Sequence, residues 1–388
     1  MTILVRHPSI EPHRILVIRN RYIGDTVLAI PFLRNLRRRF PQAVIDVLVE
    51  PGAGDLLADC PYKNELVVWH RPKRVGDVVP GSLANILATA PLLRQRRYDR
   101  AYILKRSLST GLLAWLARIP HRVGIAKDGR GLLLTRRVPF RTGCHEVELG
   151  LDVLRADGIE IDDGHNENWV AEECGRKVDG LLSRVPSTRP RVFLAPQSTD
   201  ERKQWPIERM AAMVRWLIED RGCEAFLCGA TDDMPMHDQL RARLAERAGT
   251  HLHDLTPILS LREASALLSR MDLCLGIDTG LPHVAASFGV PVVSLHGHTD
   301  PRQWRPWKTA SVIVQPADGT RSMAGITVDQ VIAATDQLID ETGAVHKARR
   351  RGVRTIDLRT GGYRYEVVES ASIAEKAASE PQAVAIGS

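Results

Sequence analysis

Short apolar runs alternate with amphipathic segments along the chain, and this alternation predicts the architecture. RILVIRN from residue 14 and RVFLAPQ from residue 191 are continuous apolar runs of the kind buried on both faces of a sheet. Segments with helical spacing of apolar positions follow them. Strands that alternate with helices indicate βαβ units and a parallel sheet. The other expected strands are residues 43–50, 65–70, 99–105, 121–126, 223–230, 251–256, 272–277, 290–297 and 311–316.

The expected helices fill the intervals between these strands. The first runs from the residues after Asp25 to Phe40, with a kink expected at Pro31. The others are residues 82–97, 112–119, 145–156, 207–221, 236–248, 261–269, 282–289 and 328–341.

The alternation weakens between residues 161 and 189, where polar residues and prolines accumulate, and we place a domain boundary there. The expected domains are residues 14–175 and 188–345. We expect the alanine- and serine-rich tail, residues 346–388, to be partly disordered. Two consecutive α/β halves with a cleft between them follow from this order.

Composition narrows the class of protein. The chain has 388 residues, of which 44% are hydrophobic and 26% are charged, as in an ordinary soluble protein. No apolar run approaches the roughly 18 residues of a membrane helix, and no signal peptide opens the chain, so we expect a cytoplasmic location. The six cysteines include no C-x-x-C pair, which favours reduced, mostly buried thiols over a metal site or disulfides.

The net charge of +7 includes two local clusters, one formed by Arg34, Arg37, Arg38 and Arg39 and one by Lys347, Arg349, Arg350 and Arg351. Such clusters have two explanations. They are either the solvated faces of helices, or surfaces that attract phosphate-bearing substrates or an anionic membrane. Nucleic acid is a less suitable partner because no recognition motif accompanies the charge. A nicotinamide oxidoreductase is also disfavoured, because the sequence PGAGD at 51–55 has Leu57 where a dinucleotide fingerprint requires its third glycine.

Three polar loops follow expected strands, at the edge where parallel sheets bind ligands. In the first, Asp25 follows Gly24 and either caps a helix or serves as a general base. In the second, residues 195–206, Ser198 and Thr199 offer hydroxyls and Lys203 offers a cation for a diphosphate, unless the lysine is merely solvated.

The third loop, with the sequence DTG at 278–280, precedes a helix whose N-terminus suits a phosphate. Asp278, Thr279, Gly280 and His283 could bracket the same anion, although a lone histidine such as His283 is more often a packed or capping residue.

Together these loops resemble glycosyltransferase family 9, the heptosyltransferases of lipopolysaccharide inner-core assembly. The resemblance covers residues 14–340 and rests on three stretches, RILVIRNRYIGDTVLAIPFLRNLRRRFP, APQSTDERKQWP and DTGLPHVAASFGVPVVSLHGHTDPRQW. It implies a GT-B fold, with two Rossmann-like domains whose parallel sheets face each other across a cleft. The N-terminal domain would bind the acceptor and the C-terminal domain the nucleotide-sugar.

The resemblance also implies a reaction and its residues. The reaction is an inverting, metal-independent transfer of a sugar, with a heptose from ADP-heptose favoured, to an acceptor hydroxyl in lipopolysaccharide core or other cell-surface glycan assembly. No cofactor is expected, and the acceptor is lipid-linked or another glycan. The enzyme would act in the cytoplasm, at the inner face of the cytoplasmic membrane if it contacts anionic lipid. The family's catalytic base falls on Asp25, and its donor-binding residues fall on Ser198, Thr199, Lys203, Gly229, Asp278, Thr279, Gly280 and His283.

The sequence departs from the family pattern in two of these stretches. Residues 20–23 replace a short Ser-Ala-Leu-like lead, and His298 replaces a proline that is common after the glycine of the last loop. The acceptor and the sugar therefore do not follow from the resemblance. A nucleotide-sugar epimerase or hydrolase and a non-catalytic GT-B binding module stay open as alternatives.

Overall fold

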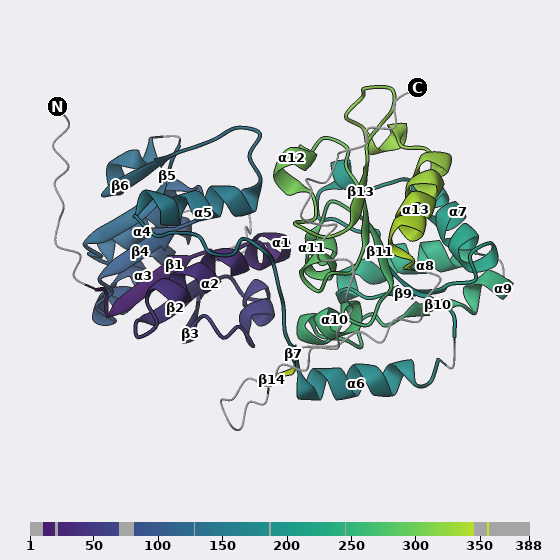
Figure 1. Ribbon diagram of the computed structural model, residues 1–388, viewed down its shortest axis with the longest axis horizontal. Coiled ribbons are helices and arrows are strands. Elements are labelled where there is room, and N and C mark those ends of the chain that lie inside the picture. The colour runs from purple at the N-terminus through teal and green to yellow at the C-terminus, as the bar shows by residue number, and fades with distance from the viewer. Residues whose placement is uncertain are drawn as a thin grey trace. The chain divides into compact units, whose positions relative to one another are not determined.

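The computed structural model describes residues 11–19, 22–69, 81–127, 129–185, 188–244, 246–344 and 355–356. These residues divide into two compact units (Figure 1). The first unit takes its described residues from Met1–Arg21, Ala29–Thr142 and Val147–Gly164. The second takes its described residues from Tyr22–Leu28, Gly143–Glu146 and His165–Ser388. The expected tail, residues 346–388, lies outside the described residues apart from 355 and 356.

The first unit is built on a six-stranded parallel sheet with the order β3-β2-β1-β4-β5-β6. Its strands are β1 (Arg14–Ile18), β2 (Val44–Val49), β3 (Glu65–Val68), β4 (Arg100–Ile103), β5 (His121–Ala126) and β6 (Arg136–Pro139). Its helices are α2 (Ile30–Arg39), α3 (Gly81–Gln95), α4 (Leu108–Leu116) and α5 (Glu146–Ala156), with the 3₁₀ turns η1 (Ala53–Leu57) and η2 (Arg130–Leu133). The central strand β1 is apolar and buried from Ile15 to Ile18, because helices cover both faces of such a sheet.

The second unit repeats this plan with the order β10-β9-β8-β11-β12-β13. Its strands are β8 (Arg191–Ala195), β9 (Glu224–Leu227), β10 (Leu252–Asp254), β11 (Leu273–Ile277), β12 (Val292–Leu295) and β13 (Ser311–Val314). A separate pair joins β7 (Val170–Ala171) to β14 (Thr355–Ile356).

The helices of the second unit include α1 (Ile23–Val27), which packs on α11 (Gly280–Ser287). The others are α6 (Glu172–Leu182), α7 (Ile207–Glu219), α8 (Met234–Ala242), α9 (Glu246–Gly249), α10 (Leu261–Leu268), α12 (Pro301–Trp304) and α13 (Val328–Thr342). The 3₁₀ turns are η3 (Glu201–Lys203), η4 (Thr231–Asp233) and η5 (Met323–Gly325).

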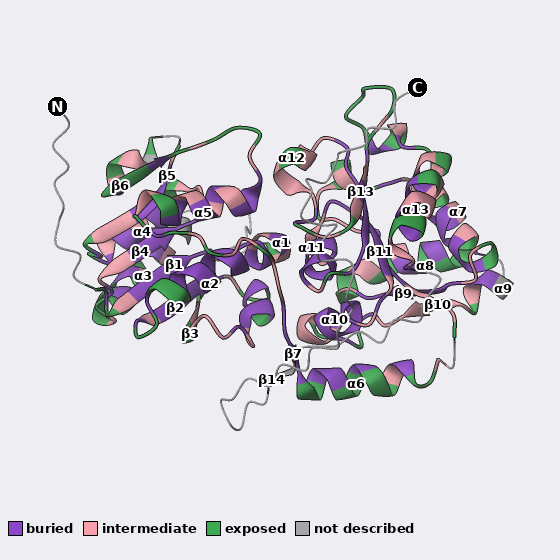
Figure 2. Ribbon diagram, viewed as in Figure 1, coloured by how far each residue is buried: buried purple, intermediate pink, exposed green. Residues whose placement is uncertain are grey.

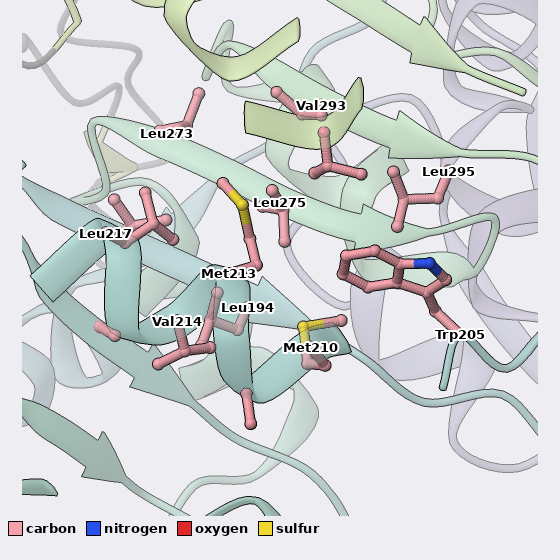
Figure 3. Close-up of a cluster of buried hydrophobic side chains, with 14 of the residues drawn as sticks. Leu194, Trp205, Met210, Met213, Val214, Leu217, Leu273, Leu275, Val293 and Leu295 are labelled. Carbon is pink, nitrogen blue, oxygen red and sulfur yellow. The ribbon is translucent and has the colours of Figure 1, made fainter. Parts of the chain in front are cut away.

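The core of the second unit forms where α7 packs on its sheet (Figure 3). Met210, Met213, Val214 and Leu217 recur every three or four residues, so α7 presents one apolar stripe to the strands. Leu275 of β11 is fully buried in this cluster. The cluster anchors β8 and β11, whose carboxyl ends carry the polar loops described below.

Burial agrees with the sequence patterns in both units (Figure 2). All six cysteines are free and five are buried, as expected. Within the described ranges, every helix is too short or too polar to span a bilayer.

Three sequence expectations about helices need correction. The segment after Asp25 does not form one kinked helix; α1 ends before Leu28, and Pro31 lies in the first turn of α2, where its missing N–H breaks no helical hydrogen bond. The helix expected over 236–248 is two helices, α8 and α9. The weakly patterned interval 161–189 contains α6, which has a buried side and an exposed side.

Candidate functional site

The second sheet has a topological switch point between β8 and β11. From β8 the chain builds outward to β9 and β10, and it then returns to place β11 on the other side of β8. Ligands of open α/β sheets bind outside the carboxyl ends of the two strands at such a point. Gln197 to Lys203 follow β8 there, and Asp278 follows β11.

Lys203 and Asp278 meet at this switch point. Lys203 Nζ lies 2.8 Å from Asp278 Oδ2 and donates a second hydrogen bond, of 3.0 Å, to the backbone oxygen of the same residue. An ammonium has three donors, so these two bonds leave one N–H of Lys203 for a ligand. Lys203 is therefore not merely a solvated surface lysine.

The carboxyl group of Asp278 is buried and ionised. Burial alone would raise its pKa, but the neighbouring His283 and the positive charge of Lys203 outweigh burial and hold the pKa well below its ordinary value. His283 Nε2 lies 3.9 Å from Asp278 Oδ1, which is an electrostatic contact rather than a hydrogen bond. The site therefore carries a fixed negative charge next to Lys203.

His283 lies in the first turn of α11 and is 4% exposed. Its Nδ1 is buried and has no hydrogen-bond partner among the described residues. A buried polar atom of this kind costs free energy unless a ligand or water completes it. His283 therefore holds, at the helix start, a buried ring nitrogen that no described group of the protein hydrogen-bonds.

The N-terminus of α11 lies in the same loop and has no side-chain cap. Thr279 is the N-cap residue, but its side chain makes no capping hydrogen bond. Amide groups at such a helix start, together with the positive end of the helix dipole, suit an anion.

Two glycines bring α1 and α11 into close contact. A Cβ atom on Gly280 would lie 2.5 Å from Ile23 Cβ, and one on Gly24 would lie 2.8 Å from the His283 ring. Only glycine fits at either position. This contact brings the first turn of α1, which includes Asp25, to the start of α11.

Asp25 occupies the third position of α1 and is half-buried. The N-cap position belongs to Tyr22, and Asp25 is the acidic residue in the first turn of the helix. Its placement in the turn that touches Gly280 and His283 groups it with the α11 loop.

Ser198, Thr199 and Gly229 also lie at this edge of the sheet. Ser198 Oγ accepts a hydrogen bond of 3.1 Å from the Asp200 amide, so its hydroxyl shapes its own loop, whereas Thr199 is exposed. Gly229 follows β9, and the side chain of Asp233 fills the space that a Cβ there would need. Gln197 donates to the Asp233 backbone oxygen at 2.9 Å and thereby ties the β8 loop to the β9 loop.

Sequence reasoning missed two histidines near these residues. His296 follows β12, is fully buried and lies between Ser294 Oγ at 2.9 Å and Thr299 Oγ1 at 3.3 Å. Burial lowers its pKa to about 4, so its ring is neutral near pH 7. A buried strand run followed directly by a histidine was the available signal.

The second missed residue is His145, which stacks on Trp307 with 4.2 Å between ring centroids. Its Nε2 lies 2.9 Å from the Arg305 backbone oxygen, 160 residues further along the chain. Since a carbonyl only accepts, Nε2 carries the proton. Burial lowers the pKa of His145 to about 4. No local pattern could have indicated this pairing.

Two Rossmann-like units of matching strand order, with an anion-suited loop at the switch point of the second, define the GT-B class of fold. The model of glycosyltransferase family 9 (heptosyltransferase) matches residues 86–323. The chain belongs to this family and is a glycosyltransferase. Membership favours a transferase over the epimerase, hydrolase and binding-module alternatives.

Individual relatives agree with this assignment. Lipopolysaccharide heptosyltransferase 2 of Salmonella typhimurium is 27% identical over 355 residues, which cover 85% of this chain and 99% of that protein. The structure of Escherichia coli ADP-heptose lipopolysaccharide heptosyltransferase II has a TM-score of 0.71 at 24% identity, covering 85% of this chain and 99% of that one. E. coli heptosyltransferase WaaC with ADP-2-deoxy-2-fluoro heptose has a TM-score of 0.63 at 18% identity, covering 84% and 99%. At these identities the structures show a shared fold.

Proposed function

We propose that the enzyme transfers a heptose from ADP-heptose to a hydroxyl of a lipopolysaccharide core acceptor. The observation that carries this proposal is the Lys203–Asp278 pair beside the uncapped start of α11. This pair and the helix start form a suitable diphosphate-binding site at the switch point of the second sheet. The similarity to lipopolysaccharide heptosyltransferases and to a structure that holds an ADP-heptose analogue supports the choice of sugar, nucleotide and acceptor class.

The proposal assigns the donor to the C-terminal domain, residues 188–345, and the acceptor to the N-terminal domain, residues 14–175. Ser198, Thr199, Lys203, Asp278, Thr279, Gly280 and His283 would surround the diphosphate, and Gly229 would lie against the nucleoside. Transfer would take place in the cytoplasm, where the acceptor would be a lipid-linked or other glycan.

In the proposed reaction the acceptor oxygen bonds to the anomeric carbon while the bond from that carbon to the diphosphate breaks. Asp25 takes the hydroxyl proton, which contributes roughly 10²–10⁴ in rate for a general base. Lys203, through its third N–H, and the α11 amides stabilise the charge that develops on the departing ADP. A preorganised donor of this kind contributes about 3–4 kcal/mol. Direct displacement inverts the anomeric configuration and calls on no metal ion.

Two substitutions separate catalysis from donor binding. Asp25→Asn should lower kcat by roughly 10²–10⁴ and leave the Kd of ADP within a few fold, because it removes the base and not the diphosphate seat. Lys203→Ala should weaken ADP binding about tenfold and lower kcat as well. Calorimetric titration with ADP and initial rates with ADP-heptose provide both readouts.

Matched controls are available on the same unit. Asp329 also lies in the first turn of a helix, and Lys177 also pairs with a carboxylate, Glu263, at 2.9 Å. Asp329→Asn and Lys177→Ala should leave both parameters unchanged. Normal turnover of Asp25→Asn would show that Asp25 is not the catalytic base. Unchanged ADP affinity of Lys203→Ala would show that Lys203 does not bind the diphosphate.

A further inference from the structure

Helix α4 is apolar on its exposed side as well as on its buried side. Leu113 and Ala114 point into the core of the first unit. Leu108, Leu112, Trp115 and Leu116 fall at i, i+4, i+7 and i+8, which is one face of a helix, and Leu108 and Trp115 on that face are more than half exposed. A helix at the surface of a monomer normally has a polar outer face, so this face lacks the solvent-facing residues expected of it.

Neighbouring elements extend the apolar surface. Helix α3 packs against α4, and Leu87, Ala90 and Pro91 of α3 form with Leu116 a groove of about 450 Å³. Turn η2 packs on α4 at Gly111, where Leu133 contacts the helix, and the adjacent Leu132 is 83% exposed. We call Leu87, Leu108, Trp115, Leu116 and Leu132 the apolar face.

Positive charge surrounds the apolar face. Residues 81–142 contain thirteen Lys or Arg residues and two acidic residues. Three of these arginines, Arg96, Arg100 and Arg141, pair with carboxylates outside this range, so the others supply the positive charge of the surface. Several of these side chains are exposed close to the apolar face. Arg94 lines the groove, Arg118 follows the C-cap residue of α4, and Arg137 Nε donates to the Gly131 backbone oxygen in η2 at 2.9 Å.

We propose that this surface docks the enzyme on an anionic membrane, with the apolar face entering the interface and the arginines meeting lipid phosphates. Leucine and tryptophan side chains partition into the headgroup boundary, and each basic residue near an anionic surface adds about 1 kcal/mol of attraction. A second copy of the chain is a poorer occupant, because a self-complementary contact would bring the exposed Arg94, Arg118 and Arg137 of one copy against those of the other. The proposal needs no assumption about sugar or acceptor.

The test is flotation of the full-length chain with vesicles, without donor or acceptor. Wild-type protein should float with phosphatidylglycerol vesicles, float less with pure phosphatidylcholine vesicles and be released by high salt. The triple variant Leu87→Ser, Leu108→Ser, Leu132→Ser should bind phosphatidylglycerol at least about tenfold more weakly. The single variant Leu132→Ser, at the most exposed position, should show a smaller loss in the same direction and leave the melting temperature unchanged.

The control is Ile258→Ser, a residue 53% exposed on the second unit, which should float as wild type does. Failure of the wild type to float, or equal binding by wild type and variants, would overturn the proposal. So would a dimer in light scattering that the triple variant abolishes, because the face would then be a contact between copies. None of these readouts depends on ADP-heptose, so failure here is distinguishable from failure of the proposed activity.

Discussion

At the scale of single residues, the Lys203–Asp278 pair gives the candidate site its electrostatic character. The two residues are 75 positions apart, and the partner carboxylate is 7% exposed in its side chain. A buried carboxylate without a counter-ion costs free energy, so the ion pair holds both side chains in position. The lysine is consequently held in one direction instead of sampling solvent.

This pair predicts a dependence of stability on pH. The pKa of Asp278 is lower in the folded protein than in the unfolded chain, so its contribution to stability is present above the unfolded value of about 4 and is lost as pH falls through the folded value. Between pH 7 and pH 3, wild-type stability should fall more than that of Asp278→Asn. Urea unfolding at a series of pH values measures this. Parallel curves for the two proteins would contradict it.

The sequence predicted some residues of the site and misjudged others for identifiable reasons. Lys203, Asp278 and His283 could be selected because loops after parallel strands converge at one edge of a sheet. The cluster that begins at Arg34 was interpreted as a solvated face or an anion-attracting surface, and for Arg34 this was wrong. Arg34 is 5% exposed and pairs with Asp163 at 2.6 Å. No local pattern indicates a partner so far along the chain.

At the scale of elements, the contact between α1 and α11 is the feature that depends most on sequence detail. It requires hydrogen in place of a side chain on both facing positions, Gly24 and Gly280. The sequence marked both glycines as loop residues, but it could not show that they face each other. Their proximity is a property of the fold.

Gly280→Ala should therefore be destabilising and inactivating. The added methyl would overlap Ile23, and overpacking of this kind costs about 1–3 kcal/mol. Gly180→Ala is the control, because Gly180 lies inside helix α6 with open space around its Cβ position, and alanine there should stabilise by about 0.5–1 kcal/mol. Thermal unfolding and transfer rates measure both effects. If both variants behave alike, the contact does not constrain the site.

Several helices were predictable from the sequence, but α6 and the exact ends of other helices were not. Apolar periodicity indicated α7 and α13 because each has one side in a core. The end of α8 depends on contacts outside the helix. Arg243, which follows α8, reaches Glu208 at 2.9 Å and accepts a hydrogen bond from Arg215 through its backbone oxygen.

At the scale of the whole molecule, the chain carries the same strand order twice, and each sheet has its own buried cluster. The repetition of strand and helix predicted two α/β units. The order of the strands within each sheet could not be read from the sequence, because pairing depends on how the crossover helices pack and not on the strands alone.

Because each unit has its own core, a core substitution in one unit should destabilise that unit and not the other. Leu275→Ala should destabilise the second unit by about 2–5 kcal/mol, because it leaves a cavity between β11 and α7. Hydrogen exchange should then show faster exchange in strands β8 to β12 and unchanged protection in β1, β2 and β4. The counterpart Leu16→Ala, in the core of the first unit, should give the reverse pattern. Uniform loss of protection in both units would show that the cores unfold together.

The ammonium of Lys203 already has a counter-ion in the resting protein. An incoming diphosphate would therefore meet a cation whose charge Asp278 already offsets, and it would gain less than it would from a bare cation. Charge alone discriminates weakly under these conditions. Selectivity would then come from the directions in which the remaining hydrogen-bond donors point. Such a binding site would distinguish anions by shape, and its affinity would change little with ionic strength.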